Sequence, residues 1–188
     1  MQKEENLVQE AVGGNQEAFA QLYEVHFDRI YRYVYLKIGD RAEAEDMTQQ
    51  VFLSALRSIT SFRWQGTPFT AWLFRIAHNL IVDHLRKKTR RPVLMDIDET
   101  LPGGSGGNPE QMAELSLNIE RLSEATRHLT RSQQEVLSLR FAGGLSIEEV
   151  SKVMGKKPGA VKALQHAAVV ALRKLLVVEE DDKVTINS

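Results

Sequence analysis

The sequence predicts an all-α fold: two small helical domains, the C-terminal one a helix-turn-helix, joined by a flexible acidic linker. Three observations support it. Apolar residues recur at helical spacing on both sides of the chain, no segment alternates with period two, and residues 92–108 combine prolines and glycines without periodicity. This linker divides the 188 residues into domains at 1–91 and 109–178, followed by an acidic tail at 179–188.

The first expected helix follows Asn15, which is a favourable N-cap residue. Its apolar residues recur at steps of three and four, as on a helix with one buried face. The stripe includes four aromatic residues: Phe19, Tyr23, Phe27 and Tyr31. Such rings could stack on nucleic-acid bases, but helical spacing with aliphatic residues between them favours burial in the core.

Two further helices are expected before the linker. The apolar stripe of the first is Ala44, Thr48, Val51, Phe52, Ala55, Leu56 and Ile59. The second opens with Thr67 as N-cap and Pro68 at the first helical position, where the missing N–H of proline costs nothing. It ends in the basic sequence HLRKKTRR, at residues 84–91.

After the linker, a helix is expected from about residue 109. Two capping boxes mark the starts of later helices, Thr130 with Gln133 and Ser146 with Glu149. Gly155 then supplies a tight turn and Pro158 begins a longer helix, the layout of a helix-turn-helix whose second helix enters the major groove. The candidate DNA contacts are Lys156, Lys157, Lys162, Gln165, His166 and Arg173. The alternative is a plain antiparallel helix pair.

A second candidate nucleic-acid surface lies on the helix that opens at Pro68. Steps of four, seven and four place Arg75, Asn79, Arg86 and Arg90 on one stripe, with Lys87 beside it. Guanidinium groups neutralise phosphates, and an amide among them can read a base edge. The preceding loop offers Arg63, Trp64 and Gln65, which are suited to holding an unstacked base. The alternative is that the cations only complement the helix dipole.

Charge is balanced in total but uneven along the chain. The net charge is +2 over 1–91, −5 over 92–115, +5 over 116–178 and −3 over 179–188, for a total of −1. Two neutral-to-basic segments separated by an acidic one are consistent with nucleic-acid contact on the basic parts, although solvated charged faces would give the same pattern.

Composition excludes several classes of function. The chain has no cysteine, so it has no disulfide scaffold, thiolate metal site or cysteine nucleophile. No apolar run approaches about 20 residues and the N-terminal sequence is acidic, so we expect a soluble cytoplasmic protein without membrane insertion. His78, Asp83 and His84 lie close in sequence but do not complete a metal-ligand pattern, and there is no glycine-rich phosphate loop. We therefore expect no metal, no cofactor and no enzymatic activity.

Three segments, at 42–56, 67–91 and 129–166, together resemble the extracytoplasmic-function (ECF) subfamily of bacterial RNA polymerase sigma factors. The likeness covers nearly the whole chain in the order and spacing of that family. It implies a protein that binds core RNA polymerase, recognises the −10 and −35 promoter elements and promotes DNA melting. The surface around Arg75 would then bind the −10 element, and the helix-turn-helix the −35 element.

The resemblance also implies protein partners. Asp46, Gln49 and Gln50 match positions that dock on the clamp helices of the β′ subunit, and an apolar groove near Leu137 and Phe141 would hold the tip of the β flap. Members of this family are commonly held inactive by an anti-sigma factor, which is a further expected partner. The alternative function is a standalone helix-turn-helix transcription regulator, which would bind operator DNA without polymerase.

Three departures from the family pattern stand out. Gln50 occupies a position where the family usually has glutamate, and His78 replaces a common arginine. Ala167 and Val170 occupy positions of the recognition helix that are usually basic. The last departure bears on how the −35 element is read.

Overall fold

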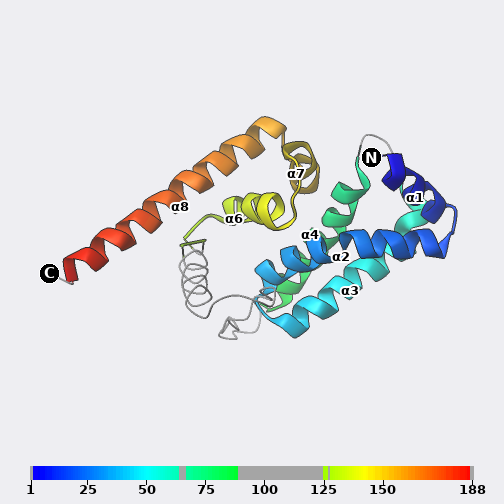
Figure 1. Ribbon diagram of the computed structural model, residues 1–188, viewed down its shortest axis with the longest axis horizontal. Coiled ribbons are helices and arrows are strands. Elements are labelled where there is room, and N and C mark those ends of the chain that lie inside the picture. Colours follow the sequence, from blue (N-terminus) through cyan, green and yellow to red (C-terminus); the bar gives the residue numbers. More distant parts are fainter. Residues whose placement is uncertain (1, 64–66, 89–124, 127, 187–188) are drawn as a thin grey trace. The chain divides into compact units, whose positions relative to one another are not determined.

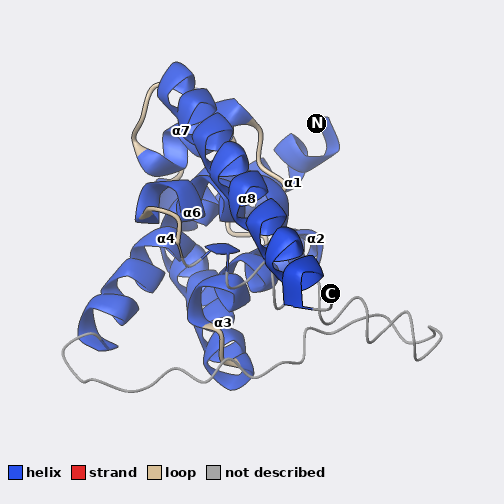
Figure 2. Ribbon diagram, turned by 90° about the vertical axis from the view of Figure 1, so that its left-hand side faces the viewer, coloured by secondary structure: helices blue, strands red, loops and turns tan. Residues whose placement is uncertain are grey.

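The computed structural model describes residues 2–63, 67–88, 125–126 and 128–186, with side chains at 4–63, 67–87, 125–126 and 128–175. All of its elements are helical, which confirms the predicted fold class for this part of the chain (Figures 1 and 2). They are α1 (Gln2–Val12), α2 (Gln16–Ile38), α3 (Arg41–Ser58), η1 (Ile59–Ser61), α4 (Phe69–Lys88), α6 (Arg131–Leu137), η2 (Ser138–Ala142), α7 (Ile147–Met154) and α8 (Pro158–Ile186). The linker and the helix expected from residue 109 lie outside the described residues.

The chain forms two compact units. The first comprises 1–98 and 138–158, and the second comprises 99–137 and 159–188. The segment 138–158, which the sequence groups with the C-terminal domain, thus packs among the N-terminal helices. The predicted domain boundaries near 91 and 109 fall outside the described residues and stay predictions.

Helix α2 is the central element of the first unit. It begins as predicted at Asn15, whose side-chain oxygen accepts hydrogen bonds from the backbone N–H groups of Glu17 and Ala18, at 3.0 and 3.2 Å. The helix contacts α1, α3, α4 and η2, and its side chains Ile30, Tyr33 and Val34 are completely buried. A helix that is covered on several sides carries apolar residues around much of its circumference, as α2 does.

Helices α3 and α4 pack on α2 and on each other. Asp40 caps α3 by accepting from the backbone N–H of Glu43 at 2.8 Å. In α4, the first helical hydrogen bond runs from the backbone N–H of Trp72 to the carbonyl of Pro68, so the helix begins at Phe69, one residue later than predicted, and Pro68 takes the N-cap position expected for Thr67. Its core side chains include Phe74, which lies 5.4 Å from Tyr33 between ring centroids.

The aromatic stripe on α2 was predicted to be buried in the core, and in the structure its rings are only partly buried. Tyr23 is 36% exposed. The rings form a ladder instead: Phe27 and Tyr31 stack at 6.2 Å between centroids, and Phe52 of α3 covers Tyr23 at 4.6 Å. The physical reason is that α2 turns a different stripe, which includes Leu22, Ile30 and Tyr33, toward its covering helices.

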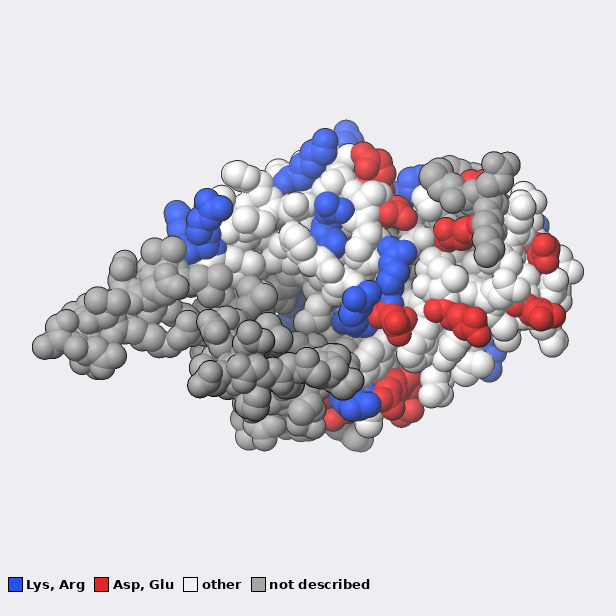
Figure 3. Space-filling view, in the orientation of Figure 1, with Lys and Arg blue, Asp and Glu red and all other residues white. Residues whose placement is uncertain are grey.

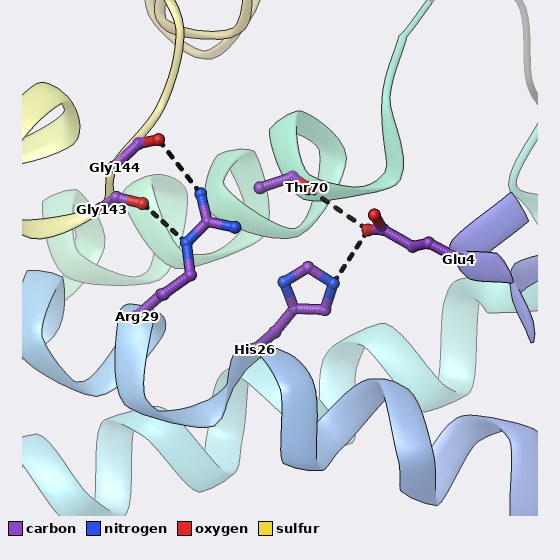
Figure 4. A network of polar contacts seen from close by, with 6 residues as sticks. All are labelled: Glu4, His26, Arg29, Thr70, Gly143 and Gly144. Carbon is purple, nitrogen blue, oxygen red and sulfur yellow. Dashed lines mark hydrogen bonds and ion pairs between the residues drawn. The ribbon is translucent and has the colours of Figure 1, made fainter. Parts of the chain in front are cut away.

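Segment 138–158 contacts α2 and α4 through η2 and α7. The Nε of Arg29 donates to the carbonyl of Gly143 at 2.9 Å and its Nη2 donates to the carbonyl of Gly144 at 3.4 Å (Figure 4). The guanidinium also lies over the ring of Phe74, 5.8 Å from its centroid. One arginine of α2 therefore satisfies two carbonyls at the end of η2.

Helix α1, which the sequence does not predict, is attached through a polar contact in the interior. His26 of α2 is 1% exposed, and its Nε2 donates to Glu4 of α1 at 3.1 Å (Figure 4). The hydroxyl of Thr70 donates to the same carboxylate oxygen at 3.5 Å. The Nδ1 atom of His26 is buried without a hydrogen-bond partner among the described residues. This arrangement requires a neutral ring, because a second ring proton would have no acceptor.

The start of α7 and the following turn agree with the prediction. Ser146 and Glu149 form a reciprocal capping box, and Gly155 ends α7 in the left-handed region at φ 63°. Glycine suits this position because a Cβ atom would be strained there. Helix α8 begins at Pro158 as expected, but it continues to Ile186 and so includes most of the predicted acidic tail.

The second unit has a small core between α6 and α8. Leu129, Leu137 and Ala168 are buried together, with Ala171 and Leu172 packed against them. The predicted capping box at α6 is present, since Thr130 and Gln133 exchange hydrogen bonds at 2.9 and 3.3 Å. This packing explains the helical spacing of apolar residues along α8.

We predict that Gly143→Ala destabilises the protein by about 1–3 kcal/mol, the usual cost of overpacking a filled site. A Cβ atom there would lie 2.7 Å from Phe74, 2.8 Å from the carbonyl of Leu139 and 2.9 Å from Leu145. Gly159→Ala is the matched control, because nothing lies within 4 Å of its Cβ position and helical alanine is expected to stabilise by about 0.4–1 kcal/mol. Urea unfolding measures both, and equal midpoints for the two variants would contradict the described packing.

We also predict that stability falls as the pH drops below about 6.5. Burial lowers the pKa of His26 below its usual 6.5, and Arg29 lowers it further against the opposing effect of Glu4 and Glu149. The unfolded chain therefore binds this proton more readily, so unfolding becomes easier as pH falls from 6.5 toward the lowered pKa. The free energy of unfolding, measured by urea titration at several pH values, should show this loss in the wild type.

The matched variants separate His26 from other titrating groups. His26→Gln should show a flatter pH dependence than the wild type, whereas replacement of the exposed His166 by glutamine should leave the dependence unchanged. A wild-type stability that is constant or rises between pH 6.5 and 5 would refute the assignment of a neutral buried ring.

Candidate nucleic-acid interface

The exposed side of α4 carries the predicted polar stripe. Arg75, Asn79 and Arg86 are all exposed, whereas Arg90 lies outside the described residues. Steps of four, three and four add Val82, which is 47% exposed, to the same face. We call Arg75, Asn79, Val82 and Arg86 the α4 stripe. The sequence did not predict Val82 on this surface, because a single valine gives no indication of whether its side chain is buried or exposed.

Arg86 already has a partner on its own helix. Its Nη2 lies 3.0 Å from Oδ1 of Asp83, one turn earlier, and the two side chains are 71% and 55% exposed. Lys87 is exposed next to this pair. The C-terminal part of the stripe is therefore an exposed ion pair with a further cation beside it, and its guanidinium remains accessible to solvent.

The loop before α4 holds one of the predicted residues within the described part. Arg63 is exposed, and its Nη1 donates to the carbonyls of Thr60 and Phe62 at 2.9 and 3.0 Å. Phe62 is buried and lies 5.1 Å from Trp72 between ring centroids, so it anchors the loop to α4. Trp64 and Gln65 lie outside the described residues.

The candidate −35 contacts lie in the turn after α7 and on α8. Lys156, Lys157, Lys162, His166 and Arg173 are exposed, and Gln165 is half-buried. The sequence of α8 contains no acidic residue before Glu179, and Figure 3 shows Lys and Arg among uncharged atoms over its described side chains. Ala167 is exposed and Val170 is 40% exposed, so the face of α8 opposite its buried residues is partly apolar.

The outer face of α3 combines polar and apolar side chains. Asp46, Gln49 and Gln50 are exposed as expected. Leu53 and Leu56 are 47% and 45% exposed, so the prediction that Leu56 is buried is wrong. Leu56 lies at the edge of the buried stripe, where periodicity alone does not distinguish core from surface. The hydrogen bond from Arg41 to Glu45, at 3.2 Å, raises the pKa of Arg41 at the start of this helix.

The two residues expected near the β flap have different exposures. Phe141 in η2 is 70% exposed, the largest value among the exposed large apolar side chains described. Leu137 is 9% exposed and belongs to the core of the second unit. Phe141 therefore presents an apolar surface, while Leu137 contributes through packing.

The histidines of α4 have partners within the fold. The Nδ1 of His78 lies 3.4 Å from the hydroxyl of Tyr33, and Nε2 of His84 lies 3.3 Å from Oε2 of Glu43 on α3 without a hydrogen bond between them. Among the residues that the structure describes, no cluster of His, Cys, Asp or Glu could hold a metal ion. In the same part of the chain, no helix has the length and apolar character needed to span a bilayer.

Family models match both parts of this arrangement. The model described as Sigma-70 region 2 matches residues 22–91, which contain α2 to α4 and the α4 stripe. The model described as Sigma-70, region 4 matches residues 119–172, which contain α6, α7 and the first part of α8. The fold and the site therefore define a sigma-70-type transcription initiation factor, a class of DNA-binding proteins that are not enzymes.

Individual relatives narrow the class. The chain is 43% identical to the ECF RNA polymerase sigma factor BldN of Streptomyces coelicolor, over 90% of this chain and 64% of that protein. It is 33% identical to the ECF RNA polymerase sigma factor SigD of Mycobacterium tuberculosis, over 93% of this chain and 84% of that protein. The structure of CnrH in complex with the cytosolic domain of CnrY superimposes with a TM-score of 0.68 at 25% identity, covering 92% of this chain and 96% of that one. The chain belongs to the ECF RNA polymerase sigma factors.

Proposed function

We propose that this sigma factor binds core RNA polymerase, directs it to promoters through their −10 and −35 elements, and promotes melting at the −10 element. The observation that carries the proposal is that region 2 and region 4 both match in order on one chain, each containing an exposed basic surface. The relatives BldN and SigD are named as sigma factors of RNA polymerase, which supports the same role.

The α4 stripe is the proposed contact with the −10 element. Arg75 and Arg86 offer guanidinium groups for phosphates, and Asn79 between them can pair with an adenine edge through its amide. Melting unstacks base steps at a mean cost of about 1.4 kcal/mol per step. Because no cofactor is proposed, the free energy must come from tighter binding to unpaired bases than to duplex, shared with polymerase.

The outer face of α3 is the proposed docking surface for the β′ clamp helices. Leu53 and Leu56 extend the predicted polar set of Asp46, Gln49 and Gln50 with exposed apolar area. Burying such side chains contributes roughly 25 cal/mol per Å² of apolar surface, while the polar groups define orientation. Phe141 is the proposed contact for the β flap, because its ring is largely exposed.

The remaining proposals concern the −35 element, regulation and location. The turn after α7 and the exposed cations of α8 are proposed to bind −35 DNA. An anti-sigma factor is proposed as a further partner that covers the polymerase-binding surfaces; the similar protein CnrH was solved in complex with another protein, the cytosolic domain of CnrY. The protein would act in the cytoplasm, where polymerase and chromosome are, and without catalytic activity of its own.

The decisive test is run-off transcription with purified bacterial core polymerase on a genomic promoter library, with and without this protein. We expect discrete start sites that appear only when it is added, and their upstream sequences would define both promoter elements. Tight binding of the protein alone to duplex DNA, with no transcription, would instead favour a standalone helix-turn-helix regulator.

Variants of the α4 stripe should distinguish contacts to phosphates, which position the DNA, from contacts to base edges, which recognise its sequence. Asn79→Ala should weaken binding of the holoenzyme to its own −10 element by about 1–3 kcal/mol and relax the preference at one base position. Arg75→Ala should weaken binding to all sequences and lower the salt dependence by about one phosphate contact. Competition binding at several salt concentrations measures both effects.

The control for these variants is Arg32→Ala on α2. Arg32 is exposed, and its Nε donates to the backbone carbonyl of Asp28 on the same helix, at 3.2 Å. It should leave promoter binding unchanged. Equal losses for all three variants would mean that net charge alone, not the α4 stripe, determines binding.

A further inference from the structure

A single carboxylate lies within the proposed −10 surface. Asp83 is the one acidic residue in the sequence of α4, which otherwise carries Arg75, Arg86 and two lysines. It is exposed and lies one turn after Asn79 and one turn before Arg86, so it borders the α4 stripe on the same side of the helix. An anionic group at this place opposes phosphate binding, and its presence needs an explanation.

Helix stability does not provide that explanation. Asp83 lies more than one turn before Lys88, the last described residue of α4, so the helix dipole does not stabilise a carboxylate there. Its pairing with Arg86 at 3.0 Å is exposed at both ends, and exposed pairs of this kind contribute little to folding. The pair therefore contributes little to the stability of the fold, although it lies beside the surface that is proposed to contact DNA.

The geometry gives the pair a direct effect on phosphate binding. Oδ1 of Asp83 accepts from Nη2 of Arg86, so a terminal nitrogen of the guanidinium is engaged before DNA arrives. A bidentate contact with phosphate uses two parallel N–H donors of the guanidinium. A phosphate must therefore compete with the carboxylate for Arg86, and it is also repelled by that carboxylate. Any DNA strand meets this penalty, whatever its sequence.

A cognate strand can offset the penalty, since a carboxylate accepts hydrogen bonds from the amino groups of bases. If Asn79 pairs with an unstacked base, as proposed above, neighbouring bases of the same strand would lie along the same side of α4, within reach of Asp83. A strand that places an amino group opposite Asp83 satisfies the carboxylate and releases Arg86 for phosphate. A strand in the wrong register or of the wrong sequence does neither.

We propose that Asp83 is a specificity-determining residue of the −10 surface: by holding Arg86, it weakens binding to non-cognate strands more than to the cognate one. This inference rests on the proposed function of the α4 stripe as the −10 contact. It assigns Asp83 a positioning role toward Arg86 and a discriminating role toward DNA.

The test compares Asp83→Asn with the wild type as holoenzymes assembled on core polymerase. The probes are two fluorescein-labelled single-stranded oligonucleotides, one carrying the −10 sequence defined by the run-off start sites and one with the same bases scrambled. We expect Asp83→Asn to bind the scrambled strand about threefold more tightly, with less change on the −10 strand. The slope of log affinity against log salt for the scrambled strand should become steeper by about 0.7, the value of one added phosphate contact on single-stranded DNA.

Two matched variants make the interpretation specific. Asp28→Asn removes an exposed carboxylate from α2 and should leave the ratio of the two affinities unchanged. In an Arg86→Ala background, Asp83→Asn should alter that ratio less than in the wild type, because the part of its effect that acts through Arg86 is lost. Thermal unfolding of Asp83→Asn should match the wild type, since a structural role alone would change melting and not the salt slope.

The outcomes separate this inference from the proposed function. If the wild-type holoenzyme initiates at discrete promoters but Asp83→Asn discriminates as well as the wild type, or gains equally on both strands, the inference is overturned and the proposed function stands. A change that persists in full without Arg86 overturns it as well. If the wild type neither initiates at discrete sites nor prefers the −10 strand, both fall together.

Discussion

The first compact unit depends on one constraint, which is that α2 has neighbours on most of its sides. Because α1, α3, α4 and η2 all contact it, polar groups on its inner faces must find partners inside the protein. His26 is paired with Glu4, Arg29 with two backbone carbonyls, and Tyr33 with His78. Each of these contacts attaches a different element to α2, so the polar partners of one helix define how the others are placed.

This arrangement determines which surfaces are available for partners. Since α3 and α4 turn their apolar stripes toward α2, their opposite faces are exposed, and both proposed interfaces lie there. The contact between His84 and Glu43, at 3.3 Å, connects the two helices near the C-terminal part of α4. Because α3 and α4 also pack on each other and on α2, the two proposed interfaces are carried by helices of one compact unit.

Features that depend on neighbouring residues in sequence were predictable, and features that depend on tertiary packing were not. The caps at Asn15, Ser146 and Thr130 and the turn at Gly155 follow from local chemistry, and the structure has all four. Leu56, the aromatic ladder and Val82 were misjudged or missed because an apolar residue at the edge of a stripe is buried or exposed according to what packs beside it. Arg75, Asn79 and Arg86 are exposed on one side of α4, as helical periodicity predicts, while their role toward DNA stays a prediction.

The packing of Phe62 against Trp72 has an optical consequence. The indole of Trp72 is half-buried and touches two aromatic rings, Phe62 of the loop and Phe69 of its own helix, at 5.1 and 5.5 Å between centroids. Indole emission depends on local polarity, so a rearrangement that moves Phe62 alters the wavelength and intensity of this fluorophore. In a Trp64→Phe variant, which removes the other tryptophan of the chain, Trp72 is an intrinsic reporter of how Phe62 packs against α4, and changes in that packing can be followed in real time without an attached dye.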